Sequence, residues 1–363
     1  MNSTGIIRTI LAITLVLSLA VAYQSSWTPI FSTPSAFAQD TPQSQRPPLR
    51  RQKTAPPNGE DEEKPKGQTA ISVAVDLVSL QVLVTDTKGN VLTGLKPENF
   101  TIYEDNVKQE ISNFSPIDSN ITVVMLVEYS NNISYFVNQI WNAMYTFAGS
   151  LRKGDWVAVI GYDLNSTILC DFTQDRQKLY EALRRFTYPS FSESNLSDAL
   201  IDALDRTQEI EGKVAILLIS TGLDTLSRHT YDEALKKCKE ANASVYAIGL
   251  GQSFRIRAEA AGLISDIGNM DLLMGDNRLK SFAEYTGGAA YFPRFDTEFP
   301  EIFSNISLLL RSQYSIAYAS TNTNKDGKFR KIRVDVSTNL TDNKGKPLKL
   351  KVITRKGYVA KES

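Results

Sequence analysis

Two residue types that build most metal centres and disulfide scaffolds are scarce in this sequence. It has one histidine, His229, and two cysteines, Cys170 and Cys238. A single histidine excludes a multi-histidine metal site, and two cysteines can form one bridge at most. An excess of one charge is also lacking, since 40 basic residues face 40 acidic ones. This balance argues against nucleic acid as a partner and against charge-driven binding to an anionic membrane.

A long apolar run is lacking as well. The stretch 10–22 offers about thirteen mostly apolar residues after Arg8, where a membrane-spanning helix needs about 20. Small-x-small sites follow at 20–22 and 36–38. We therefore interpret residues 1–38 as a signal peptide or short export signal, which places the protein in the periplasm, the cell envelope or the medium. An uncleaved N-terminal anchor is the alternative, and it would be the only attachment to a membrane.

Residues 39–68 contain proline and charge but almost no large apolar side chains. Such a segment cannot bury enough surface to offset the entropy of ordering it. The sequence therefore predicts a disordered linker between the export signal and the folded part.

Both flanks of the remaining chain alternate apolar and polar residues, which is typical of half-buried strands. The first flank, 69–117, shows this from Ile71 to Val84 and again over 100–104, and 91–95 is expected to return as a partner strand. The last flank, 313–363, shows it at 332–336 and 348–352, around a turn at 343–345. We expect the two flanks to pair into one small β unit.

The middle, 118–312, has a different pattern. Four short runs, 122–127, 156–161, 214–219 and 244–250, are apolar on both faces. Amphipathic helical patterns separate them, at 133–151, 179–186 and 196–204. This alternation predicts an α/β domain with a Rossmann-like, doubly wound and mainly parallel sheet. The stretch 251–277 exceeds what a crossover needs, so it is expected to be a binding loop near the rim or a decorated edge.

Oxygen-bearing side chains follow three segments that should meet at one sheet edge. Glu128, Ser130 and Asn132 follow the first strand, Ser194 precedes a helix, and Thr221 follows the strand 214–219. Ligands bind beyond the carboxyl ends of parallel strands. Oxygen donors of this kind suit a hard cation such as Mg²⁺.

The chain resembles a known family at this point. The strand ending in a D-x-S-x-S-like motif, the later hydroxyl loop and the third strand end resemble the metal-ion-dependent adhesion site (MIDAS) of von Willebrand factor type A domains. The flanks LVTDTKGNVLTGLKPENFTIYEDNVKQEISNF, QYSIAY, DGKFRKIRV and RKGY resemble a related bacterial envelope family. The resemblance covers about 70 to 358 and implies an α/β domain that binds protein partners.

The departures from the family motif concern the metal ligands. Glu128 stands where the family has Asp, and Asn132 where it has a second Ser. Ser130 matches, Ser194 stands for Thr, and Thr221 stands where the family has its second Asp. The resemblance implies a dication held by two carboxylates, and this chain keeps one. We therefore predict a degenerate site that binds no metal or binds Mg²⁺ or Mn²⁺ weakly. Asp224 is the candidate auxiliary ligand, but it lies three residues further along the turn than the family's second Asp.

The sequence favours a non-enzymatic interaction or adhesion module with a protein partner in the cell envelope. Thr221, Ser194, Asn132 and the stretch 251–277 are expected to form a polar rim for direct contacts. Two alternatives stay open, namely a purely structural module of an envelope assembly and a metal-bridged adhesion domain that uses Glu128. A hydrolase built on His229, Ser227 and Asp224 is disfavoured because no G-x-S-x-G motif accompanies them.

Overall fold

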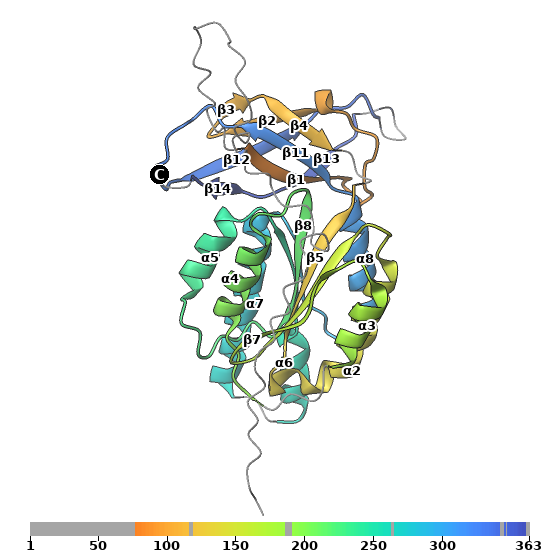
Figure 1. Ribbon diagram of the computed structural model, residues 1–363, viewed down its shortest axis with the longest axis vertical. Coiled ribbons are helices and arrows are strands. Elements are labelled where there is room, and N and C mark those ends of the chain that lie inside the picture. The colour runs from red at the N-terminus through yellow and green to blue at the C-terminus, as the bar shows by residue number, and fades with distance from the viewer. Residues whose placement is uncertain are drawn as a thin grey trace, which may run out of the picture. The chain divides into compact units, whose positions relative to one another are not determined.

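A computed structural model describes residues 77–115, 119–185, 191–262, 265–341, 345 and 347–360 (Figure 1). The export signal, the linker and the start of the first alternating stretch lie outside these residues. Phe186, at the end of one expected helix, and part of the turn 343–345 lie outside them too.

A six-stranded sheet forms the centre of the α/β domain, in the order β10-β9-β8-β5-β6-β7. Its strands are β5 (Ile121–Glu128), β6 (Trp156–Tyr162), β7 (Ser166–Thr173), β8 (Lys213–Ser220), β9 (Ser244–Gly249) and β10 (Ala290–Tyr291). All neighbours run parallel except β6 and β7. Every residue of β5, β8 and β9 is buried. The predicted mainly parallel sheet is thereby confirmed, and β7 adds an antiparallel edge.

Helices cover both faces of this sheet (Figure 1). One apolar cluster joins the sheet to α2 (Val137–Ser150), α3 (Arg176–Arg184) and α8 (Phe299–Arg311), and another joins it to α4 (Leu196–Thr207), α5 (Tyr231–Glu240) and α7 (Asp266–Thr286). Alternate residues of β5 divide between them, since Val123 and Met125 belong to the first cluster and Val124 and Leu126 to the second. The expected doubly wound architecture follows from this alternation.

Two further four-stranded sheets combine strands from both flanks of the chain. Their orders are β13-β1-β11-β4 and β14-β12-β2-β3. The strands are β1 (Leu77–Asp86), β2 (Phe100–Glu104), β3 (Val107–Gln109), β4 (Ile111–Ser115), β11 (Tyr314–Ala319), β12 (Phe329–Val336), β13 (Leu350–Ile353) and β14 (Gly357–Val359). Pairing of β1 with β11 and β2 with β12 confirms the small β unit. The expected strand 91–95 was wrong, because only Val91 forms a bridge, to Thr85.

Most of the described residues of the stretch 251–277 are helical. It forms α6 (Gly251–Ala260) and the first half of α7. Ser265 caps α7, since its side chain accepts a hydrogen bond from the amide of Gly268. Of the two alternatives for this stretch, the binding loop was wrong, because a packed helix pair is present instead.

Candidate functional site

The carboxylate of Glu128 is the centre of the polar cluster at the end of β5. Glu128 is completely buried. Oε1 accepts a hydrogen bond from Ser130 Oγ at 2.5 Å, and Oε2 accepts from Ser220 Oγ at 2.9 Å and from the Thr221 amide at 2.7 Å. Thr221 Oγ1 lies 3.1 and 2.9 Å from the two oxygens. Strands β5 and β8 are thus linked through one buried carboxyl group.

These donors leave the carboxylate little capacity to bind a cation. An ionised carboxylate offers about four lone-pair sites. Three hydroxyls and one amide direct four hydrogens at Glu128. To bind a metal, Glu128 would have to give up such bonds. Among the described residues that hydrogen-bond to Glu128, none is a second carboxylate that could offset the charge of a dication. Among the described residues, no group of three or more His, Cys, Asp and Glu side chains is placed to hold a metal. The metal that the resemblance implies does not fit this arrangement.

A buried tyrosine extends the cluster from β6. Tyr162 Oη donates to Ser220 Oγ at 2.8 Å, and Ser220 Oγ also accepts from the Gly222 amide at 2.9 Å. Burial, followed by the nearby charge of Glu128, raises the pKa of the Tyr162 phenol. The phenol therefore stays protonated and acts as a donor, which turns the Ser220 hydroxyl toward Glu128.

Burial also raises the pKa of Glu128 itself, while the hydrogen bonds from Ser130, Thr221 and Ser220 oppose that shift. Desolvation is the largest cause because water is excluded from the carboxyl group. The folded protein therefore takes up a proton at this position more readily than the unfolded chain does.

Not all of the predicted site residues contact the Glu128 carboxylate. Asn132 is partly exposed, and its Nδ2 donates to the carbonyl of Ser192 at 3.0 Å. Ser194 is fully buried, as is Thr221. The expected polar rim is therefore corrected, because buried Ser194 and Thr221 are not available for direct contacts.

Asp224 accepts hydrogen bonds at the start of α4. Its Oδ2 accepts from the amide of Ser197 at 3.2 Å and from the hydroxyl of the same residue. Oδ1 accepts from Ser227 Oγ at 2.5 Å. Both oxygens of the Asp224 carboxylate therefore accept hydrogen bonds from these donors. Among the described residues, no hydrogen bond joins Asp224 to the Glu128 cluster.

The arrangement around His229 stabilises a loop. His229 Nδ1 lies 2.7 Å from Asp198 Oδ1, and Asp198 also accepts from the amides of Arg228 and His229. Because Ser227 donates to Asp224 instead, serine, histidine and this aspartate do not form a nucleophile–base relay.

Two glycines that sequence reasoning missed set the position of Thr221. A Cβ on Gly222 would lie 2.5 Å from the carbonyl carbon of Gly275 in α7, and one on Gly275 would lie 2.8 Å from the Thr221 carbonyl oxygen. Gly222 also has φ +79°, a conformation that favours glycine. The close approach of α7 thereby fixes the loop after β8. The only signal in the sequence was the glycine that follows Thr221.

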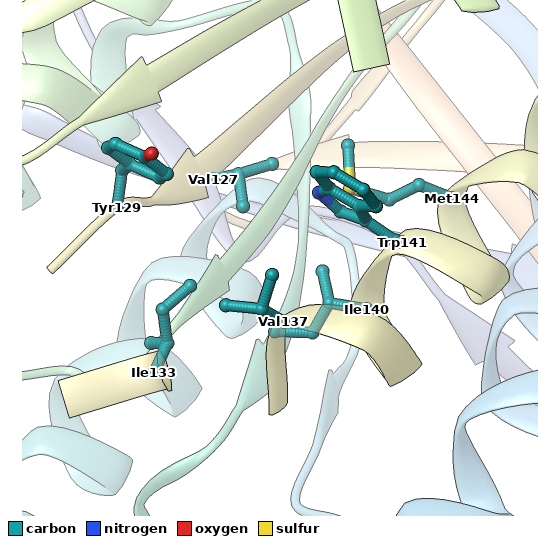
Figure 2. A pocket seen from close by; sticks show the side chains of 7 residues that line it. All are labelled: Val127, Tyr129, Ile133, Val137, Ile140, Trp141 and Met144. Carbon is teal, nitrogen blue, oxygen red and sulfur yellow. The ribbon is translucent and has the colours of Figure 1, made fainter. Parts of the chain in front are cut away.

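Two cavities lie near this edge. Figure 2 shows the smaller one, of about 10 Å³, where side chains of β5 and α2 such as Val127 and Trp141 converge. Its apolar lining and size leave no room for a ligand. The larger, of about 180 Å³, is lined by residues that include Tyr129, Asp163 and Arg185. It opens on the β6–β7 side of the cluster.

The two cysteines are free thiols, with Cys238 buried in α5 and Cys170 partly buried in β7. Burial raises the pKa of Cys170 to about 11. Neither is therefore a reactive thiolate at neutral pH.

No described helix combines the length and the apolar character that crossing a bilayer demands.

Comparison with known proteins finds a family match within the α/β part of the chain. Residues 122–263 match the von Willebrand factor type A domain, whereas no curated protein matches the sequence. One similar solved structure is the conserved hypothetical protein BatB of Bacteroides thetaiotaomicron, which is 17% identical, with a TM-score of 0.39. The match covers 52% of this chain and 98% of that chain. The domain of the type V pilus tip protein Mfa5 of Porphyromonas gingivalis has 13% identity, with 53% and 95% covered and a TM-score of 0.41. A von Willebrand factor type A protein of Catenulispora acidiphila has 11% identity, with 79% and 75% covered and a TM-score of 0.42.

The match begins at the second residue of β5 and extends to the connection between α6 and α7. It therefore includes the strand ends that carry Glu128 and Thr221. Together with the doubly wound sheet, it shows that this chain contains a von Willebrand factor type A domain.

Proposed function

We propose that the protein is a non-enzymatic protein–protein interaction module of an exported envelope protein, and that it recognises its partner without a bridging metal. The observation that carries this proposal is the closed hydrogen-bond shell of Glu128. An acidic partner cannot share a cation with a carboxylate whose lone pairs are already occupied. Recognition then depends on direct contacts made by residues exposed around the same sheet edge, where ligands of open parallel sheets bind.

Site-specific photo-crosslinking in the cells that make the protein tests this proposal. One crosslinking residue replaces Asn131, which is exposed next to the Glu128 cluster, and the control replaces Leu308, which is 56% exposed on α8. We expect a protein adduct at position 131 that survives treatment with EDTA, and none at position 308. An adduct lost with EDTA would instead favour metal-bridged adhesion. Absence of any adduct at position 131 would favour a purely structural module.

A further inference from the structure

Helix α7 is apolar on two opposite sides in its first half. One side is buried in the domain and includes Leu272, Gly275 and Leu279. The other side exposes four large apolar residues: Ile267 is 76% exposed, Met270 59%, Leu273 44% and Met274 48%. We call these four residues the α7 stripe. The solvent-facing side of a surface helix is normally polar, so this exposed apolar side requires an explanation.

The spacing of the α7 stripe makes it continuous. Ile267, Met270 and Met274 stand at i, i+3 and i+7, and a helix turns about 100° per residue, so they share one face. Leu273 adjoins Met270 and Met274 on that face. Single exposed apolar side chains are ordinary, whereas a contiguous group marks an interaction surface.

The α7 stripe belongs to the helix that borders the candidate site. Away from the α7 stripe, Gly275 packs against the carbonyl of Thr221. Arg278, one turn beyond Met274, reaches the same loop, since its Nη1 donates to the carbonyl of Gly222 at 3.4 Å. A partner on the α7 stripe would therefore lie on the helix that contacts the loop after β8.

Charges around the α7 stripe indicate what kind of partner it accepts. Asp266 and Asp271 are exposed on the same half of α7, and the ion pairs recorded within the described ranges include neither of them. The neighbouring arginines of α6 are engaged, since Arg255 binds Asp276 at 3.0 Å and Arg257 pairs with Asp296. Arg278 is beyond the end of the stripe, and its guanidinium is directed at the carbonyl of Gly222. The charge left beside Ile267, Met270 and Leu273 is thus negative.

We propose that the α7 stripe docks an amphipathic segment of a partner protein, with apolar side chains flanked by Lys or Arg. This inference rests on the proposed function and gives it a surface and a partner chemistry. Two methionines suit the role because their flexible thioether side chains adapt to different apolar shapes. Lysine or arginine on the partner complements Asp266 and Asp271, whereas an anionic lipid surface would be repelled by them.

Fluorescence anisotropy with two synthetic helical peptides tests the proposal on the full chain. Both peptides carry the same leucine stripe, flanked by lysines in one and by glutamates in the other. We expect the lysine peptide to bind at least about tenfold more tightly, with a preference that weakens as salt rises. Equal binding of the two peptides would overturn the proposed partner chemistry.

Variants assign the binding to the surface. Ile267→Ser, Met270→Ser and Met274→Ser are combined in one chain, and Leu308→Ser on α8 is the matched control, since all four side chains are exposed. The triple variant is expected to bind the lysine peptide at least about tenfold more weakly, and the control to bind as the wild type does. Unchanged binding in the triple variant would overturn the proposal. Asp266→Lys with Asp271→Lys should transfer the preference to the glutamate peptide.

Two further outcomes would replace the proposed partner. Sedimentation that shows a wild-type dimer and a monomeric triple variant would assign the α7 stripe to a second copy of this chain. Binding to vesicles of anionic lipid that the triple variant loses would assign it to a membrane. If the adduct at position 131 forms while the α7 variants have no effect, the proposed function stands and this inference fails.

Discussion

The backbone amide of Thr221 donates to Glu128 Oε2 at 2.7 Å, and the hydroxyl of the same residue lies 2.9 Å from that oxygen. The longer Glu128 side chain crosses from β5 to the end of β8, and the Thr221 hydroxyl meets it as a donor. A threonine donor on one strand end and a glutamate acceptor on the next therefore satisfy each other. Both departures from the motif contribute to the same hydrogen bonds.

Metal binding should return when both departures are reversed. The combined variant Glu128→Asp with Thr221→Asp removes the hydroxyl donor and supplies two short carboxylates, and oxygen ligands in such a set suit Mg²⁺. Calorimetric titration with Mg²⁺ and Mn²⁺ is expected to give binding weaker than about millimolar for the wild type and at least about tenfold tighter for the double variant. Micromolar binding by the wild type that disappears in Glu128→Ala would contradict the closed-shell interpretation.

Stability should depend on pH through Glu128. Its folded pKa is raised above the ordinary value of 4.5, so the folded state binds more protons than the unfolded state between 4.5 and the raised pKa. The free energy of unfolding therefore falls as pH rises through that window, with a slope of at most about 1.4 kcal/mol per pH unit from one group. Urea unfolding across this range measures the slope.

Glu128→Gln should remove this contribution. The amide keeps one oxygen for the Thr221 amide, and its nitrogen can donate to the hydroxyls of Ser130 and Thr221. The slope that Glu128 adds should vanish in this variant and persist in Glu301→Gln, which alters an exposed carboxyl on α8. An identical slope in the wild type and Glu128→Gln would show that the carboxyl does not titrate in this window.

The close approach of α7 to the loop after β8 predicts opposite effects for two glycine substitutions. A Cβ at position 275 would meet backbone atoms at 2.8 and 2.9 Å, so Gly275→Ala should lower the free energy of unfolding by about 1–3 kcal/mol. Gly149→Ala in α2 would meet only Tyr180 Oη at 3.7 Å and should gain up to about 1 kcal/mol from helix propensity. Denaturant unfolding of both variants provides the comparison. A gain in Gly275→Ala would mean that the loop moves freely away from α7.

The sequence predicted the central sheet because its strands are apolar on both faces, a pattern that a parallel sheet covered by helices requires. It failed at α7 because Ile267, Met270 and Met274 face solvent, which removes the amphipathic period that identifies a helix. At the site, strand-end polarity identified Glu128 and Thr221. Ser220 and Tyr162 escaped notice since their roles depend on neighbouring strands, and no spacing along the chain records that juxtaposition.

A buried arginine links the C-terminal flank to the α/β domain and should be costly to remove. Arg355 is 5% exposed, and it donates to the carbonyl oxygens of Ala241 at 2.7 Å and Gly357 at 2.9 Å, and to that of Lys239. Burial lowers the pKa of its guanidinium to about 10, so it stays charged at neutral pH. Arg355→Met leaves three carbonyls without their charged donor, and a loss of about 3 kcal/mol or more is expected from urea unfolding.

Arg333→Met serves as its control. Arg333 is exposed in β12, where it pairs with Asp335 and lies 4.0 Å from the centre of the Tyr103 ring. Exposed ion pairs contribute about 1 kcal/mol or less because solvent screens them. A loss for Arg355→Met as small as that for Arg333→Met would mean that water replaces the guanidinium at the three carbonyls. In that event the last turn of α5 would not depend on the C-terminal flank for its hydrogen bonds.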